Sequence, residues 1–512
     1  MEIEVPAALV PFLQRLTADP NDYEANKAVA SFLVSNPDTR LQSLEFFSRA
    51  LAHRQTDDPD HQPMLERYSD ILIYKGDFES AFEPLSNLVS THPAHNPQYD
   101  VYLAVSCFRT GRVEMASDAA RKIVGHLYDS AREHAEQSDE PVTQLLTPDN
   151  ILRSHFGELA IKLDLYAKAK ILGLTPDVRA LLPVLRDEVV NGCLYDCLKS
   201  CLSNEISFPS SVEERDAWVR KHPTHLLLDH YVDGNGRGLD MNRYMVVVQR
   251  QWEESGRGPL VTLPDTYDEK GWALLRERGL PDDGWFACFH ARGGGYRSDF
   301  TAGNLTHYRN SDIGAYIPAM EAVRERGGWV VRLGDPSMPP LPRMEGVIDY
   351  ATSDWRDDWI DVFLLARSRF FVGVPSGPIA VAQAFGVPIV GVNWFPFEEW
   401  LANSNVISIF KRYRQIDTGD YMTVDRMASP EIRRLFSKSA FDAKGIEVVD
   451  NTSEEICATV VEMLDSCDGL IEYSAEDDDL QQQFEDHTDL FDVGVNGRIG
   501  RDFLSRHRSL LG

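Results

Sequence analysis

The sequence predicts an α/β protein in which an all-α N-terminal region precedes two successive regions with parallel sheets. Three observations support this prediction. The first 140 or so residues show helical periodicity only, and short apolar runs then alternate with helices, as in parallel sheets with crossover helices. The chain has 512 residues, of which 43% are hydrophobic, enough for roughly three domains. We expect boundaries at 1–142, 143–270 and 271–470, with a tail at 471–512.

The N-terminal region contains two similar stretches centred on Gly76 and Gly111. Each glycine is expected to break a pair of helices, and each is followed five residues later by an alanine, Ala81 or Ala116, that permits close packing. The pattern resembles tetratricopeptide repeats, in which stacked helix pairs bury a continuous core. A generic helical bundle is the alternative. The expected role of this region is to bind a protein partner or a second copy of the chain.

The composition excludes several partner classes. A net charge of -29 and a pI near 4.8 oppose attraction to nucleic acid or to anionic membranes, so local arginines must hold any anionic ligand. The N-terminus lacks the features of a signal peptide, and no run of 18 uncharged apolar residues occurs. We therefore expect a cytoplasmic protein without a membrane span.

Seven cysteines in a long chain indicate reduced thiols. Cys193, Cys197 and Cys201 recur every four residues, which places them along one stripe of a helix. We expect a buried apolar face, with a metal site as the less favoured alternative. We expect neither a bound metal nor a cofactor.

The first α/β region begins near residue 150. Residues 150–172 predict a short strand, a turn at Gly157 and a helix, and Val178–Val184 predicts the next strand. Further apolar runs that fill out this region are Leu226–Leu228, Met245–Val248 and Leu260–Leu263. A helix within Pro264–Gly284 is expected to link the two α/β regions.

The most informative segment of the second α/β region is 369–393. Phe370–Val374 predicts a strand, Ile379–Phe385 a helix and Val387–Val392 a second strand. Ser376 and Gly377 then fall at the start of the helix, where unpaired N–H groups favour an anion, and Pro378 suits the first helical turn. An ordinary capped helix is the alternative.

Other predicted strands of this region also end in polar groups or glycines. The run from Trp285 ends in an imidazole, an arginine and glycines, and the next two strands end in arginine, carboxylate and phenol groups. Because ligands of open α/β sheets bind at the carboxyl ends of the strands, we predict a nucleotide pocket there. Its expected residues are His290, Arg292, Gly293, Gly294, Arg332, Gly334, Asp335, Asp349, Tyr350, Ser376, Gly377 and Pro378. For Asp335 and Asp349, turn or cap roles are the alternative.

The segments 307–313, 326–338, 344–350 and 369–377 resemble a bacterial family grouped with the glycosyltransferases. Residues 361–390 are similar to the donor-site segment of heptosyltransferases, and His290-Ala291-Arg292 is similar to the His-x-Arg motif of fucosyltransferases. The resemblance implies two facing Rossmann-like domains, the GT-B architecture, with a nucleotide-sugar donor in the cleft. It also implies sugar transfer to a glycan, lipid-linked or protein acceptor. Because hydrogen-bond donors aimed at the diphosphate are the main need of this reaction, we expect transfer without a metal.

The sequence departs from heptosyltransferases where Pro375 and Ala380 replace aspartate and histidine. The catalytic base therefore stays open among His155, Glu158 and Asp299. Arg297, Tyr308 and Arg309 are candidates to shape or close the pocket. Two other functions remain open: a nucleotide-sugar epimerase, and an inactive sugar-nucleotide sensor on a helical-repeat scaffold.

The tail is characterised by its charge. Residues 474–480 are acidic and predict a solvated link, 480–490 predict a helix, and 498–508 are basic. We expect this end to fold back over the first α/β region or to bind a partner.

Overall fold

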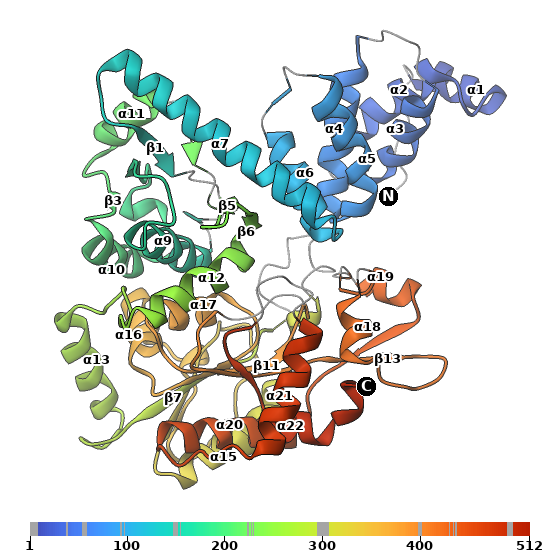
Figure 1. The fold of residues 1–512 in the computed structure, drawn as a ribbon. Coiled ribbons are helices and arrows are strands. Elements are labelled where there is room, and N and C mark those ends of the chain that lie inside the picture. Colours follow the sequence, from blue (N-terminus) through green and yellow to red (C-terminus); the bar gives the residue numbers. More distant parts are fainter. Residues whose placement is uncertain are drawn as a thin grey trace. The chain divides into compact units, whose positions relative to one another are not determined.

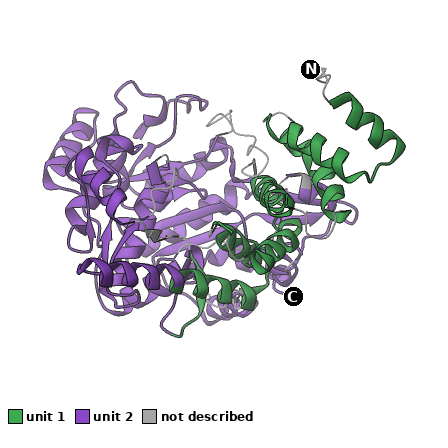
Figure 2. Cartoon of the chain, turned by 90° about the horizontal axis from the view of Figure 1, so that it is seen from above, with its two compact units in different colours: residues 1–125, 235–240 green, residues 126–234, 241–512 purple. Residues whose placement is uncertain are grey.

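The structure is a computed structural model. The residues that it describes are 9–36, 39–53, 59–92, 95–96, 98–146, 152–153, 155–222, 225–226, 228, 230–293, 307–397, 402–429, 431–433, 435, 438–488 and 495–512. The chain forms two compact units, coloured separately in Figure 2. The first comprises residues 1–125 and 235–240, and the second comprises residues 126–234 and 241–512.

The first unit is built from helices, as the periodicity predicts. Its described α-helices are α1 (Val10–Ala18), α2 (Tyr23–Val34), α3 (Ser43–Ala52), α4 (His61–Lys75), α5 (Phe78–Thr91), α6 (Gln98–Arg109) and the first half of α7 (Val113–Ser138). The short strand β6 (Gly238–Asp240) belongs to the same unit, and the N–H of Gly238 donates to Ser117 Oγ at 2.9 Å.

The two stretches that resemble each other in sequence also fold alike. Gly76 ends α4 with a φ of 74°, and Gly111 follows α6 with a φ of 67°. After each glycine the next N–H donates back to a helix carbonyl at 2.9 Å, from Asp77 to Leu72 and from Arg112 to Cys107. The predicted helix–glycine–helix units are thus confirmed. Their assignment to tetratricopeptide repeats stays a prediction.

The second unit begins with a four-stranded sheet in which all neighbouring strands are parallel. The order is β3-β2-β1-β4, with β1 (Thr143–Leu146), β2 (Arg179–Leu181), β3 (Ile206–Ser207) and β4 (His225–Leu226). The α-helices of this part are α9 (Phe156–Ile171), α10 (Gly192–Leu202), α11 (Val212–Lys221), α12 (Met241–Glu254) and α13 (Asp265–Glu277). The α13 helix confirms the helix predicted within Pro264–Gly284, while its role as a link between domains stays a prediction. The α10 helix confirms the helical cysteine stripe, with Cys193 and Cys197 buried.

Four local predictions in this region are wrong. The strand lies upstream, at β1, and Gly157 is inside the first turn of α9 rather than in a turn before it. Met245–Val248 belongs to α12, whose buried Tyr244, Val248 and Trp252 recur every four residues. The apolar run was therefore too short to show the helical periodicity of this segment. Residues Leu260–Leu263 form no strand.

The larger sheet has seven parallel strands in the order β15-β12-β11-β10-β7-β8-β9. Its strands are β7 (Phe286–His290), β8 (Trp329–Arg332), β9 (Val347–Ile348), β10 (Phe371–Gly373), β11 (Ile389–Trp394), β12 (Val406–Phe410) and β15 (Arg498–Ile499). The predicted strand–helix–strand unit is confirmed as β10, α17 (Gly377–Ala384) and β11.

Helices cover both faces of the larger sheet. Figure 1 shows α15 (Ile317–Glu325) and α20 (Ser453–Cys467) below it, and α16 (Asp358–Arg367) and α17 above it. Further elements of this part of the chain are α18 (Val424–Ala428), α19 (Lys438–Ala443), α21 (Ala475–Thr488), α22 (Arg501–Arg506) and the antiparallel pair β13 (Arg412–Gln415) and β14 (Ile446–Val449). One hydrophobic core cluster runs from Leu146 to Leu511 and includes residues of both sheets.

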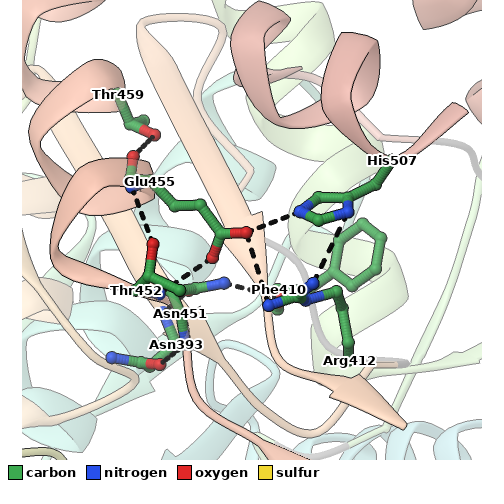
Figure 3. Close-up of polar contacts among 8 residues, drawn as sticks. All are labelled: Asn393, Phe410, Arg412, Asn451, Thr452, Glu455, Thr459 and His507. Atoms are coloured by element: carbon green, nitrogen blue, oxygen red, sulfur yellow. Dashed lines mark hydrogen bonds and ion pairs between the residues drawn. The ribbon is translucent and has the colours of Figure 1, made fainter. Parts of the chain in front are cut away.

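The C-terminal tail differs from the prediction. The acidic segment lies in α21 rather than in a link, and β15 pairs with β12, so this end completes the larger sheet. Figure 3 shows how the last residues are held: the Glu455 carboxylate accepts from His507 Nε2 at 2.5 Å and lies 3.4 Å from the Arg412 guanidinium. Pairing in the sheet and a buried ion pair thus fix the tail, and charge pattern alone did not reveal this.

Candidate functional site

The strand order of the larger sheet reverses between β7 and β10. Along the chain, β7, β8 and β9 are added in one direction, and β10, β11, β12 and β15 in the other. At such a switch point the loops leave a crevice outside the carboxyl ends of the two central strands. Gly373 of β10 is the register partner of His290 of β7, on strands about 4.8 Å apart. The segments that follow them, Arg292–Gly293 and Ser376–Gly377, therefore leave the same edge of the sheet.

His290 is a buried, neutral imidazole at the end of β7. Its Nδ1 lies 3.3 Å from the carbonyl oxygen of Leu333. A carbonyl can only accept, so Nδ1 carries the proton and Nε2 is left as an acceptor. Burial, assisted by the nearby Arg332 and Arg292 guanidinium groups, lowers the pKa of His290 to about 4. The side chain is therefore uncharged at neutral pH.

The start of α17 is uncapped. Ser376 is the N-cap residue, yet its side chain makes no capping hydrogen bond, and its Oγ is buried without a partner among the described residues. Pro378 in the first turn has no N–H, and that turn contains no acidic residue. A buried hydroxyl and the positive end of a helix thus lie together at the switch point, which is a suitable environment for an anion.

The N-terminal turn of α9 packs directly against this helix start. A Cβ on Gly157 would lie 2.7 Å from Gly377 Cα and 3.0 Å from Ala380 Cβ, so only glycine permits the contact. Two helix ends that each carry about half a positive charge therefore meet. The positive potential of both ends strengthens the preference for an anion at this place.

Two of the three predicted bases are on α9. His155 is its exposed N-cap residue, and Glu158 is in its first turn, with an oxygen 3.7 Å from Nζ of the buried Lys162. Because α9 packs on α17, both residues lie near the carboxyl edge of the larger sheet, although α9 belongs to the region of the smaller sheet. Asp299, together with Gly294 and Arg297, lies outside the described residues.

Arg332 and Asp349 bind each other. Arg332 is 1% exposed, and its guanidinium donates to Asp349 Oδ1 at 2.9 Å. Asp349 Oδ2 accepts from the N–H of Leu341 at 2.9 Å. Because both side chains are engaged within the chain, this pair fixes the loop after β8.

The other residues predicted at β8 and β9 also have partners within the chain. Asp335 accepts from the N–H of Ser337 at 2.9 Å, which is the turn role that the sequence left open. Tyr350 is fully buried, and its hydroxyl accepts from the N–H of Asp357 at 3.1 Å. A Cβ on Gly334 would lie 2.4 Å from Met338 Sδ, so this glycine allows the loop to pack. Of the predicted site residues, those after β7 and β10 therefore lie at neighbouring strand ends. Those after β8 and β9 make contacts that stabilise their own loops.

Two of the three pocket-shaping candidates are within the part of the chain that the structure describes. Tyr308 and Arg309 form the short helix His307–Arg309. The Tyr308 ring packs against Phe395 and Phe441 at centroid distances of 5.4 and 5.2 Å. These contacts anchor Tyr308 in the hydrophobic core.

Sequence reasoning missed a group of polar residues beside Arg292. The Arg292 carbonyl accepts from the N–H of Ser311 at 3.1 Å, and Ser311 Oγ accepts from Asn393 Nδ2 at 3.0 Å. Lys411 is 2% exposed, and its Nζ donates to Asn310 O at 3.1 Å and to Asp450 Oδ1 at 2.6 Å. Asn393 and Lys411 directly follow buried strand residues, which was a signal available from sequence.

Among the described residues, no group of three or more histidine, cysteine, aspartate or glutamate side chains is arranged to hold a metal ion. The described part of the chain also has no helix with the length and apolar character needed to cross a membrane.

Comparison with known proteins gave matches to solved structures only. No family model and no curated protein sequence matches the chain. One similar structure is a family 9 glycosyl transferase from Veillonella parvula DSM 2008, at 10% identity and a TM-score of 0.31, covering 52% of this chain and 85% of that one. Another is the dodecameric iron-containing heptosyltransferase TibC in complex with ADP-D-beta-D-heptose, at 13% identity and a TM-score of 0.33, covering 64% of this chain and 77% of that one.

Proposed function

We propose that the chain is a glycosyltransferase that moves a sugar from a nucleoside-diphosphate sugar to an acceptor hydroxyl. The observation that carries the proposal is the position of two anion-binding groups at one switch point. Arg292 follows β7, and Ser376–Gly377 follows β10, the strand that pairs with β7 in the sheet. In this proposal the two sheets belong to two facing Rossmann-like domains, and the donor binds between them.

The chemistry of sugar transfer explains why these groups are suitable. When the bond between the sugar and the diphosphate breaks, negative charge develops on the leaving oxygen. The Arg292 guanidinium, the start of α17 and the unpartnered Ser376 Oγ would stabilise this charge, so the proposed transfer requires no metal. His290 is neutral and adds no positive charge to the site. In this proposal its Nε2 accepts a hydrogen bond from a sugar or ribose hydroxyl.

The acceptor hydroxyl needs a base, which we propose comes from α9. His155 is exposed at the start of the helix, whereas the Glu158 carboxylate is 3.7 Å from Lys162. His155 and Glu158 both stay candidates. Asp299 stays a third candidate. The acceptor class, whether glycan, lipid-linked or protein, is left open, with the helical N-terminal unit as the proposed binding site for a protein partner.

The proposal is tested by binding and by transfer. A thermal-shift screen of nucleoside diphosphates should give a shift of several degrees with one base, and Arg292→Ala should lose it. We propose that the protein acts in the bacterial cytoplasm. Incubation with radiolabelled nucleotide-sugars and bacterial cell fractions should then give a labelled product.

Three other results would contradict the proposal. Binding without transfer to water or to any acceptor fraction would favour the inactive sensor, and release of an isomerised donor would favour an epimerase. Absence of any nucleotide-dependent shift would contradict the donor site itself.

A further inference from the structure

Ser311 connects the two strands that flank β10 in the larger sheet. Its N–H donates to the carbonyl oxygen of Arg292 at 3.1 Å, and its Oγ lies 3.0 Å from Asn393 Nδ2. Arg292 follows β7, Asn393 belongs to β11, and β10 lies between these two strands. The connection therefore joins the chain on both sides of the strand that Ser376–Gly377 follow.

Arg292 and Asn393 lie at the same level of the sheet. Gly391 of β11 pairs with Gly373 of β10, which in turn pairs with His290 of β7. Arg292 and Asn393 each come two residues after this row, at the carboxyl edge. A contact across this edge can therefore set the position of the Arg292 main chain relative to the neighbouring strands.

The Asn393 side chain is held in one orientation, as Figure 3 shows. Asn393 is 1% exposed and has a φ of 50°, which asparagine adopts more readily than most residues. Its Oδ1 accepts from the N–H of Asn451 at 2.6 Å, and its own N–H donates to Asn451 Oδ1 at 2.6 Å. Because a main-chain N–H can only donate, the atom that faces it is the oxygen. The amide nitrogen of Asn393 is thus directed at Ser311, whose Oγ accepts.

Two further side chains hold the same segment. Ser311 Oγ also lies 2.9 Å from the hydroxyl of the fully buried Tyr316. Nζ of the buried Lys411 donates to the carbonyl oxygen of Asn310 at 3.1 Å and to Asp450 Oδ1 at 2.6 Å. Residues 310–311 are therefore bonded to the ends of β11 and β12, which makes them a fixed support for the Arg292 carbonyl.

We propose that Ser311, held by Asn393, is a positioning residue of the donor site. It fixes the main chain at Arg292, so that the guanidinium and the start of α17 contact one diphosphate. Such placement matters because a bidentate contact between arginine and phosphate depends on both distance and angle. The inference rests on the proposed function and deepens it, and it gives neither Ser311 nor Asn393 a contact with the donor.

The test measures the affinity of the full chain, by calorimetry, for the nucleoside diphosphate that the thermal-shift screen selects. Ser311→Ala keeps the N–H that donates to Arg292 but loses the bond to Asn393. It should weaken binding about tenfold, because a displacement of about 1 Å spoils a bidentate contact. Ser311→Thr, which keeps the hydroxyl, should restore the affinity. Ser353→Ala is the matched control, since it removes a partly buried hydroxyl that donates to the Tyr350 carbonyl at 2.9 Å, and it should leave the affinity unchanged.

A double-mutant cycle shows whether Ser311 acts through Arg292. Arg292→Lys keeps the charge but places it on a flexible stem, so that binding depends less on where the main chain is held. In that background Ser311→Ala should weaken binding by less than about threefold. An equal loss in both backgrounds would overturn the proposal, as would a crystal structure in which Ser311 Oγ contacts the nucleotide itself.

The positioning role and the proposed function fail in different ways. A chain that binds no nucleoside diphosphate contradicts the proposed function and the positioning role with it. A chain that binds one, and keeps its affinity in Ser311→Ala or does not regain it in Ser311→Thr, contradicts the positioning role alone.

Discussion

Ser376 and Thr452 are both N-cap residues, but their hydrogen bonding differs. Its buried hydroxyl has no partner among the described residues, whereas Thr452, the N-cap of α20, forms a complete capping box with Glu455. Ser376→Ala should therefore leave the free energy of unfolding unchanged or slightly higher, while weakening nucleoside-diphosphate binding about tenfold, the equivalent of one hydrogen bond of about 1.4 kcal/mol. Chemical denaturation and calorimetry measure the two effects.

Thr452→Ala is the matched control. Loss of a used cap should cost about 1 kcal/mol of stability and leave nucleotide affinity intact. Equal losses of stability in the two variants would contradict the assignment of Ser376 to a ligand.

We expect the stability of the protein to decrease at acid pH because of His290. Its pKa is lowered to about 4 in the folded state, from an unfolded value near 6.5, so the unfolded chain binds more protons between these values. The stability that the neutral imidazole preserves is fully present above about pH 6.5, and is lost as the pH falls towards 4. The loss should reach about 3 kcal/mol.

His290→Asn, whose side-chain N–H can still donate to the Leu333 carbonyl, should remove this part of the pH dependence in denaturation series between pH 4 and 7. An unchanged slope in the variant would show that another group titrates.

At the level of elements, the contact between α9 and α17 depends on Gly157. In Gly157→Ala the new Cβ would lie 2.7 Å from Gly377 Cα, and backbone cannot move as a side-chain end can. Although alanine favours helix, we expect a net loss of about 1–3 kcal/mol and a strong loss of transfer activity. Thermal denaturation and the radiolabel assay measure these effects.

Gly125→Ala provides the control, because a Cβ at that position of α7 has nothing within 4 Å. It should stabilise the protein by up to about 1 kcal/mol. A Gly157→Ala variant that behaves like Gly125→Ala would mean that the two helices do not pack in this way.

The ion pair in Figure 3 should fix the C-terminal elements. Glu455 is buried between Arg412 and His507, so Glu455→Ala would leave the buried Arg412 without its carboxylate and should cost about 3–5 kcal/mol. The exposed pair Lys438–Asp442 is the comparison, and Asp442→Ala should cost less than about 1 kcal/mol. Urea denaturation measures the free energy of unfolding of both variants. Similar small losses in the two would show that the tail is held by pairing with β12 alone.

Which elements could be predicted from the sequence depended on the length of the pattern. The segment 369–393 carries strand, glycine break, helix and strand together, and the structure reproduces it as β10, α17 and β11. Met245–Val248 was too short to separate a strand from a buried helix face. The tail was misjudged because β15 is two residues long and its pairing with β12 is a long-range contact that composition does not reveal.

For the whole molecule, the strand order is what the sequence could not provide. Spacing along the chain predicted that polar groups end several strands, and register shows that the β7 and β10 ends adjoin at the reversal of order. It also shows that Arg332 and Asp349 bind each other, a pairing that the spacing alone did not identify. The packing of α9 against α17 was likewise invisible, since it joins glycines more than two hundred residues apart.

A chain with a net charge of -29 must concentrate positive potential locally to hold a diphosphate. The most direct measurement is a crystal structure of the chain with the nucleoside diphosphate selected by thermal shift. We expect one diphosphate to accept hydrogen bonds both from the Arg292 guanidinium and from the N–H groups or hydroxyl at Ser376–Gly377. A nucleotide bound elsewhere, or one that contacts only one of these two groups, would contradict the account.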